Sequence, residues 1–456
     1  MISRRDALRS SALGFGWLAL ADILCAQTPA RDPLAPRSPH FTPKAKRVIF
    51  LFMHGGPSQV DTFDHKPRLA ADDGKPLPFP LPRVVSSATG NLLKSPFAFR
   101  QHGQSGAWAS ELFPHVAARA DDLCFIKSMH GSNSRHGGAL LELHTGSDTF
   151  VRPSMGSWVT YGLGTEGRDL PGFVSICPTL THGGVNNYSS AFLPAAYQAT
   201  PLGNAGTPAA RAAVPFVRGT TPPAQQRLEI ELLADLERQR TSAPDAAAEG
   251  RIQSFETAFR MQAAAPGVQD LTRETTETHR LYGIDEPATE NFGRQCLMAR
   301  RFAEAGVRFV QCTHSYKWDQ HENLKRDHTT NAREVDKPVA GLLTDLKRRG
   351  LLADTLVVWG GEFGRTPVAQ GKDGRDHNPH GFTMFLAGGG VKAGHSHGAT
   401  DDYGYFAVEN KVHIHDLHAT MLHLLGLDHT RLTYRHAGRD FRLTDVHGEV
   451  VREVLA

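Results

Sequence analysis

Five short, continuously apolar runs recur along the chain, and segments with apolar residues at helical spacing lie between them. A short run that is apolar at every position is typical of a parallel strand buried on both faces. Alternation of such runs with helices predicts an α/β fold, with a mostly parallel central sheet and helices on both faces. The predicted strands are residues 47–53, 123–126, 307–312, 355–359 and 382–387.

Helical periodicity predicts three helices that each end at or before a glycine, and two more without that signal. Residues 200–224 are rich in Ala, Pro, Gly and Thr and show no period. We therefore expect residues 200–285 to be an insertion in a single domain of residues 47–456, which follows a Pro-rich linker at 27–46. The predicted helices are residues 290–304, 334–349 and 415–425, and also 225–240 and 248–263.

The N-terminus has the layout of a twin-arginine export signal. Arg4 and Arg5 precede a mildly apolar stretch from Ser11 to Cys25, which is too short to span a bilayer comfortably. We expect residues 1–26 to be a signal peptide and the twin-arginine export machinery to be a partner. The mature protein would then be periplasmic or extracellular, with no stable membrane span. The alternative is an uncleaved arm with a chance Arg-Arg pair.

Composition narrows the range of partners. The chain of 456 residues carries a formal charge of +3, and residues 1–26 hold three arginines against two aspartates, so the mature chain would carry +2. No basic stripe is present, so nucleic acid is not an expected partner. None of the five cysteines is spaced as C-x-x-C, which argues against a zinc knuckle or a redox pair and leaves one disulfide open.

Histidine is the unusual residue, because ten of the 24 lie between residues 377 and 436. In an open parallel sheet, ligands collect at the carboxyl edge of the strands. Several histidines with two carboxylates there would suit one or two divalent ions such as zinc, manganese or calcium. Two ions would favour displacement at phosphorus or sulfur. The polar residues that follow the runs, or lead into the last one, are His54, Ser132–His136, His314, Asp319, His321, Glu362 and Asp376–His380.

Several motifs resemble a known family from about residue 40 to the C-terminus. The chain is similar to the exported proteins of domain of unknown function 1501 (DUF1501), within the alkaline-phosphatase and sulfatase superfamily. The resemblance implies an alkaline-phosphatase-like (sulfatase-like) core and a metal site. The motifs are Met53–Ser58 (MHGGPS), Arg152–Trp158 (RPSMGSW), Gly360–Pro367 (GGEFGRTP), Gly374–His377 (GRDH) and His415–Thr420 (HDLHAT).

The resemblance implies oxygen or nitrogen ligands after two of the strands. His54 stands where the first strand of the superfamily ends in a ligand Asp, and Glu362 stands where a later strand does. Glu can replace Asp as an oxygen ligand, but Phe363 occupies the place of a ligand His and cannot bind a metal. The structural alternatives for Glu362 are a helix cap and an ion pair with Arg365.

A second set of ligands is implied in the same way. Asp319 and His321 match an Asp and His pair that binds the other metal of the superfamily. The late ligand His matches His377, with His380 as the alternative. For Asp319, His321 and His377 the structural alternative is a solvated loop side chain.

The attacking group is ambiguous. Sulfatases carry Cys-x-Pro-Ser-Arg before a helix that ends in Thr-Gly, whereas Gly131–His136 holds no Cys, so the formylglycine mechanism is not available. Counting back from Thr145 without a gap places His136 at the nucleophile position, and a short gap places Ser132 or Ser134 there. A serine beside a metal at a helix N-terminus could attack phosphorus, whereas His136 could instead bind metal or form a phosphoimidazole. Ser132 is slightly preferred.

These features favour an exported metal-dependent hydrolase of phosphate or sulfate esters, acting on a small molecule or a glycan. Phosphate is slightly preferred because the sulfatase Cys is absent. Arg365 and Arg375 are candidates to hold the anionic substrate bidentately, although solvated arginines are equally common. The alternative is a non-catalytic metal- or glycan-binding member of the same fold.

Overall fold

The computed structural model describes residues 32–82, 89–215, 217, 219, 221–240 and 246–456. The predicted signal peptide lies outside the described residues, as does the start of the predicted linker. The remainder of that linker packs on the body of the protein, since Leu34 and Ala45 are buried. Among the described residues, none of the helices combines the length and the apolar character that a membrane crossing requires.

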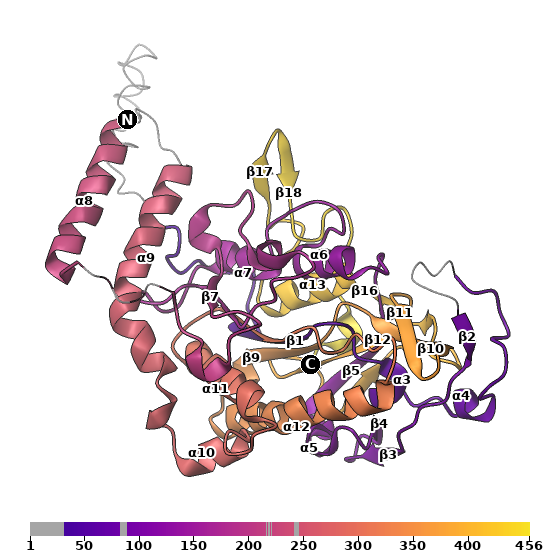
Figure 1. The fold of residues 1–456 in the computed structure, drawn as a ribbon. Helices are drawn as coiled ribbons and strands as arrows, with labels where there is room; N and C mark the ends of the chain where they lie inside the picture. Colours follow the sequence, from indigo (N-terminus) through magenta and orange to yellow (C-terminus); the bar gives the residue numbers. More distant parts are fainter. Residues whose placement is uncertain (1–31, 83–88, 216, 218, 220, 241–245) are drawn as a thin grey trace, which may run out of the picture.

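A nine-stranded sheet forms the centre of the protein (Figure 1). Its order is β13-β5-β12-β9-β1-β8-β6-β7, and β16 pairs with β5. β12 is antiparallel to both of its neighbours, whereas the other pairings are parallel. The predicted fold class is therefore confirmed. The strands are β1 (Arg47–Met53), β5 (Leu123–His130), β6 (Phe173–Ile176), β7 (Thr200–Leu202), β8 (Phe309–His314), β9 (Thr355–Gly360), β12 (Phe382–Ala387), β13 (His395–His397) and β16 (Val412–His413).

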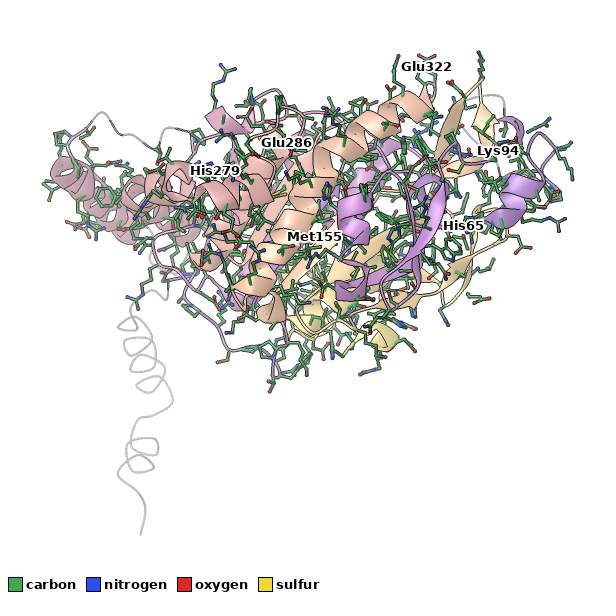
Figure 2. The ribbon with its side chains drawn as sticks, turned by 90° about the horizontal axis from the view of Figure 1, so that it is seen from below. His65, Lys94, Met155, His279, Glu286 and Glu322 are labelled. Atoms are coloured by element: carbon green, nitrogen blue, oxygen red, sulfur yellow. The ribbon has the colours of Figure 1, made fainter. Side chains whose placement is uncertain are left out.

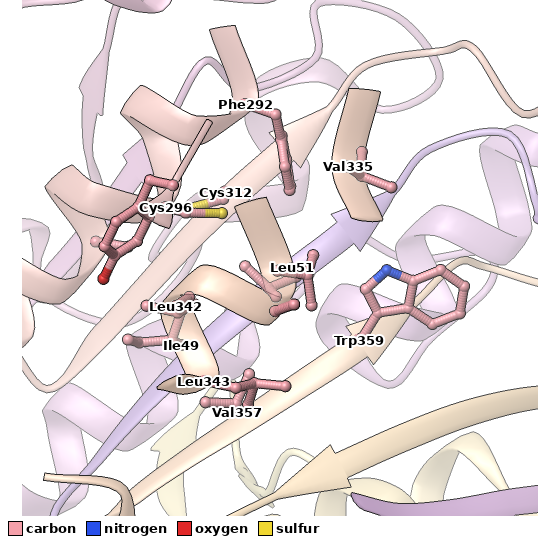
Figure 3. Packing of buried hydrophobic residues seen from close by; sticks show 14 of the residues in the cluster. Ile49, Leu51, Phe292, Cys296, Cys312, Val335, Leu342, Leu343, Val357 and Trp359 are labelled. Carbon is pink, nitrogen blue, oxygen red and sulfur yellow. The ribbon is translucent and has the colours of Figure 1, made fainter. Parts of the chain in front are cut away.

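Helices cover both faces of this sheet, and β1 shows why (Figures 1 and 3). Ile49 and Leu51 point into a core shared with α11 and α12, whereas Phe50 and Phe52 point into a second core on the opposite face. A strand in the middle of such a sheet must be apolar at every position, which is the pattern of the sequence. The covering helices are α6 (His136–Thr145), α7 (Met155–Leu163) and α13 (Ile414–Leu424) on one face and α5 (Pro114–Ala117), α11 (Glu290–Glu304) and α12 (Leu324–Arg348) on the other.

The five predicted strands are all present, and α11 has the predicted bounds. α12 begins ten residues earlier than the sequence indicates. Its first turns are mostly polar, and only Leu324, His328 and Asn331 turn inward there, so the apolar period is weak at this end. The four cysteines among the described residues are buried free thiols.

The segment predicted to be an insertion begins inside the sheet, because β7 is its edge strand. It continues into α8 (Pro223–Arg240) and α9 (Ala246–Gln269), which pack against each other and project from the body (Figure 1). α10 (Thr276–Leu281) returns the chain to α11.

A smaller antiparallel sheet, β11-β10-β2, lies beside the carboxyl edge of the large sheet. Its hairpin pairs Arg365 with His377, so it brings two candidate residues to that edge. The remaining elements are β2 (Thr89–Leu92), β10 (Gly364–Gln370), β11 (Gly374–Asn378), α3 (Gln59–Thr62), α4 (Pro67–Ala71) and the hairpins β3 (Phe99–His102)–β4 (Ala107–Ser110), β14 (Ala399–Thr400)–β15 (Ala407–Glu409) and β17 (Tyr434–His436)–β18 (Arg439–Phe441).

Candidate metal centre

The loops that follow β1, β8 and β9 meet at the carboxyl edge of the sheet. Gly55, in the turn after β1, has a φ of +115°, and a Cβ there would lie 2.7 Å from the backbone nitrogen of Asp319. Only glycine fits both conditions. The Gly55 N–H donates to the Glu362 carboxylate, at 3.0 Å from Oε1 and 3.2 Å from Oε2. The turn after β1 is thus fixed against the loops after β8 and β9.

Asp319 is the centre of a cluster in which three histidines converge. Its Oδ1 lies 3.2 Å from Nε2 of His136, 2.9 Å from Nε2 of His321 and 3.1 Å from Nε2 of His377. His136 begins α6, His321 lies in the loop after β8 with Asp319, and His377 lies on β11. Figure 2 labels Glu322, which directly follows His321 and precedes α12. We call these four residues the Asp319 centre.

The Nδ1 atom of each histidine in the Asp319 centre contacts an oxygen that accepts a hydrogen bond. Nδ1 of His136 lies 2.7 Å from Oε1 of Glu362, and Nδ1 of His377 lies 2.7 Å from the carbonyl oxygen of Ser134. Nδ1 of His321 contacts Oε1 of Gln370. Because these oxygens accept, each Nδ1 carries a proton, and in the neutral form of each ring Nε2 directs a lone pair toward Asp319.

Three lone pairs and a carboxylate oxygen would repel one another unless a cation or protons lay between them. The ligand atoms of the Asp319 centre lie within 4.8 Å of one another, which is the size of a metal site. Imidazole nitrogens with one carboxylate suit zinc and other borderline divalent ions. The residues of the Asp319 centre therefore fit a divalent metal ion.

The pKa shifts agree with this geometry. Burial acts to raise the pKa of Asp319, but the three histidine contacts and the charge of Arg365 outweigh it and hold that pKa well below its usual range. Burial also acts to lower the pKa of His136, yet its bonds to Asp319 and Glu362 raise it. The bond to Asp319 raises the pKa of His321. The carboxylate thus attracts positive charge to the position where an ion would bind.

His54 belongs to a second, overlapping group. Ligand atoms of His54, His136 and His182 lie within 4.8 Å of one another, and Nε2 of His54 is 3.3 Å from Nδ1 of His182. Nδ1 of His54 is buried and has no hydrogen-bond partner among the described residues. Burial lowers the pKa of His54 to about 4, so the ring is neutral and keeps a lone pair for a ligand.

Two members of this region, His182 and Tyr316, were not predicted from the sequence. His182 follows β6, a short strand that was not predicted, and the only signal was the pair of glycines after it. Tyr316 lies in the loop after β8 and donates to Oδ2 of Asp319 at 3.1 Å.

Glu362, predicted as a ligand, lies behind His136. It is fully buried, and both of its oxygens accept the N–H of Gly55, while Oε1 also contacts Nδ1 of His136. Burial acts to raise its pKa, but the neighbouring histidines, foremost His136 through its hydrogen bond, lower it to about 2. These contacts suit a carboxylate that orients a ligand histidine, and direct coordination by Glu362 stays a prediction.

Ser132, the preferred nucleophile, makes its contacts elsewhere. It is exposed, its N–H donates to Glu142 and its Oγ lies 3.1 Å from Nε2 of His413. Nδ1 of His413 accepts the N–H of His415, so the neutral ring carries its proton on Nε2 and donates it to Ser132. His413 is therefore not oriented to take a proton from Ser132. His380, the alternative to His377, stacks on Tyr405 instead.

Both arginines predicted to hold substrate are fully buried. Arg365 donates to Oδ1 of Asp319 at 2.7 Å and to the carbonyl oxygens of Gly55, Gly56 and Trp318. Arg375 donates to Asp61, with its Nε 2.7 Å from Oδ2. Their substrate-binding roles stay predictions, while the structure gives both arginines partners within the protein.

Fold and site together define an α/β protein with a candidate divalent-metal centre at the carboxyl edge of its sheet. The chain belongs to the family described as "Protein of unknown function (DUF1501)", which matches residues 45–455. This membership confirms the resemblance carried by the motifs. No curated protein matches the chain in sequence.

Solved structures with some similarity to the chain include a synthase, a phosphatase and a sulfatase. The lipoteichoic acid synthase LtaP from Listeria monocytogenes has a TM-score of 0.37 and 10% identity, over 90% of this chain and 78% of that one. The alkaline phosphatase from the Antarctic bacterium TAB5 has a TM-score of 0.35 and 11% identity, over 84% and 98%. The PsFucS1 sulfatase from Pseudoalteromonas sp. has a TM-score of 0.33 and 11% identity, over 90% and 71%.

Replacing Arg375 with Ala should destabilise the fold. The change leaves the Asp61 carboxylate buried without its cation, which costs about 3–5 kcal/mol in the free energy of unfolding. Denaturant unfolding followed by circular dichroism measures this. The control is Arg326→Ala, because Arg326 pairs with Asp327 at the surface, and a loss of similar size there would contradict the argument.

Asp319→Asn should weaken metal binding. Loss of the charged oxygen is expected to reduce affinity for Zn²⁺ or Mn²⁺ by about 10–100-fold or more, with the fold retained. Isothermal titration calorimetry, together with elemental analysis of the purified protein, checks this. Asp285→Asn, at an exposed position, is the matched control, and equal affinities in the two variants would rule out the Asp319 centre as the site.

Metal affinity should rise with pH. The pKa values of His136 and His321 are raised, so below those values a proton competes with the ion at Nε2. Affinity should increase by up to about tenfold per pH unit for each proton displaced and should level off once both rings are neutral. Titrations between pH 6 and 9 in buffers of different ionisation enthalpy measure the affinity and the protons released. A flat profile without proton release would contradict the assignment.

Proposed function

We propose that the protein is an exported metal-dependent hydrolase of phosphate or sulfate esters, with phosphate esters preferred. The observation that supports this most is the Asp319 centre, in which three Nε2 atoms of fixed tautomer face one carboxylate oxygen. The preference for phosphate rests on the lack of a Cys in residues 131–136. Export through the twin-arginine machinery rests on Arg4 and Arg5.

In this proposal His136, Asp319, His321 and His377 hold the ion. When bound, a divalent ion would polarise an ester oxygen and lower the pKa of a water molecule. Glu362 keeps the proton of His136 on Nδ1, and Arg365 holds Asp319 in place.

Water is the attacking group that fits these contacts best. Ser132 accepts a hydrogen bond from His413, and the neighbouring Glu142 carboxylate accepts the backbone N–H of Ser132. Nδ1 of His136 is engaged by Glu362, and its Nε2 faces Asp319. Ser132 and His136, the two attacking groups preferred from the sequence, are therefore occupied in other ways.

A non-catalytic metal- or glycan-binding protein is the second candidate, and Phe363 is the observation that favours it. Its buried ring stacks on His377, with centroids 4.5 Å apart, and lies 4.9 Å from the ring of His136. An apolar ring thus closes one side of the Asp319 centre, where the family resemblance places a ligand His.

Turnover of aryl phosphate and aryl sulfate, assayed with added zinc, manganese or calcium, separates the two candidates. We expect phosphate turnover that Asp319→Ala abolishes with the fold intact, and that Ser132→Ala reduces by no more than about twofold, as for an ordinary surface change. A large loss in Ser132→Ala would make that serine the attacking group. Stoichiometric metal without turnover of either ester would contradict the hydrolase and favour the binding protein.

A further inference from the structure

Tyr316 is an exposed aromatic residue beside the Asp319 centre. The residue as a whole is 44% exposed, although its ring packs against three histidines. Ring centroids lie 4.9 Å from His54, 5.6 Å from His136 and 4.8 Å from His182. One part of the ring therefore covers these histidines while another part faces solvent.

The backbone at this position is held in a conformation that a tyrosine seldom adopts. Tyr316 has a φ of +41°, and His182, which faces its ring, has a φ of +50°. Left-handed backbone is unfavourable for bulky residues and is retained mainly at functional sites. Asn187 fixes the His182 loop by donating to the His182 carbonyl oxygen at 3.2 Å. Two loops thus hold both side chains in place over the site.

Exposed apolar residues flank His182 on the same loop. Leu180 is 65% exposed and Val185 is 50% exposed. Val185 lies in the short helix η2 (Gly184–Tyr188), which packs against α6, the helix that begins at His136. Large apolar side chains exposed near a polar centre are typical of a surface that binds the apolar part of a ligand.

The Tyr316 hydroxyl donates a hydrogen bond to Oδ2 of Asp319, with the two oxygens 3.1 Å apart. This bond holds the ring at a fixed angle, so the exposed part of the ring forms a rigid surface.

We propose that Tyr316, with Leu180 and Val185, forms a subsite for a ring with an apolar face, aryl or sugar, carried by the alcohol part of the ester substrate. An aromatic ring stacks favourably on such a face. The subsite rests on the proposed function, since it assumes that the anionic group of the ester lies at the metal centre. The subsite favours esters whose alcohol part carries a ring over inorganic phosphate and over small esters without a ring.

Binding of two phosphonates that cannot be hydrolysed tests the subsite without any turnover. Calorimetry with the zinc-loaded protein should show phenylphosphonate binding about tenfold more tightly than methylphosphonate. Tyr316→Ala, compared at the same zinc stoichiometry as the unaltered protein, should bring that ratio close to one. Tyr316→Phe, which loses the hydrogen bond to Asp319 and keeps the ring, should retain the preference.

Variants at the surface test whether Leu180 and Val185 contribute to the subsite. Leu180→Ser with Val185→Ser should lower the phenylphosphonate preference, whereas Val408→Ser, at an exposed position on β15, should not. Equal affinities for the two phosphonates in the unaltered protein, or an unchanged ratio in Tyr316→Ala, would overturn the subsite and leave the hydrolase proposal standing. A preserved preference without turnover of any ester would support the subsite and overturn the hydrolase. Binding of neither phosphonate would overturn the subsite.

Discussion

The partly buried carboxylate of Asp319 is the group on which the site depends. Its Oδ1 lies 2.7 Å from a guanidinium nitrogen of Arg365 and within 3.2 Å of three imidazole nitrogens. A buried charge must be compensated, because its desolvation is costly. Arg365 supplies one positive charge, and the carbonyl oxygens of Gly55, Gly56 and Trp318 hold that guanidinium. The loops after β1 and β8 and the start of β10 are thereby tied to one side of the carboxylate. The other side is left for a cation.

Glu362 illustrates how geometry, and not residue type, separates a ligand from a positioning residue. Both Asp319 and Glu362 are carboxylates that follow strands at the same edge. Asp319 faces Nε2 atoms, which carry the lone pairs, whereas Glu362 faces an Nδ1 atom and a backbone N–H. A carboxylate that accepts an Nδ1 proton makes the opposite nitrogen of that ring a better ligand. The two acids therefore act on His136 from opposite sides.

The sequence predicts the sheet and much of the site for one shared reason. Runs that are apolar at every position identify central strands, and the carboxyl ends of such strands meet, so His54, Asp319 and Glu362 were expected at one edge and are found together there. His182 and Tyr316 were missed because both lie in aperiodic loops at left-handed positions, which no hydrophobic pattern marks. The burial of Arg365 and Arg375 was also missed, since their partners are largely backbone carbonyls and a distant Asp61, and these depend on tertiary packing.

The overlap of the two histidine groups bears on the number of ions. An imidazole nitrogen offers one lone pair, and Nδ1 of His136 keeps its proton because Glu362 accepts it. Nε2 of His136 can then serve the Asp319 centre or the group with His54 and His182, but not both at once. The Asp319 centre holds a charged oxygen, whereas burial lowers the pKa values of His54 and His182 and leaves that group neutral. A divalent cation gains more from the charged set. The arrangement therefore favours one ion at the Asp319 centre, with His54 and His182 forming the wall on which Tyr316 packs.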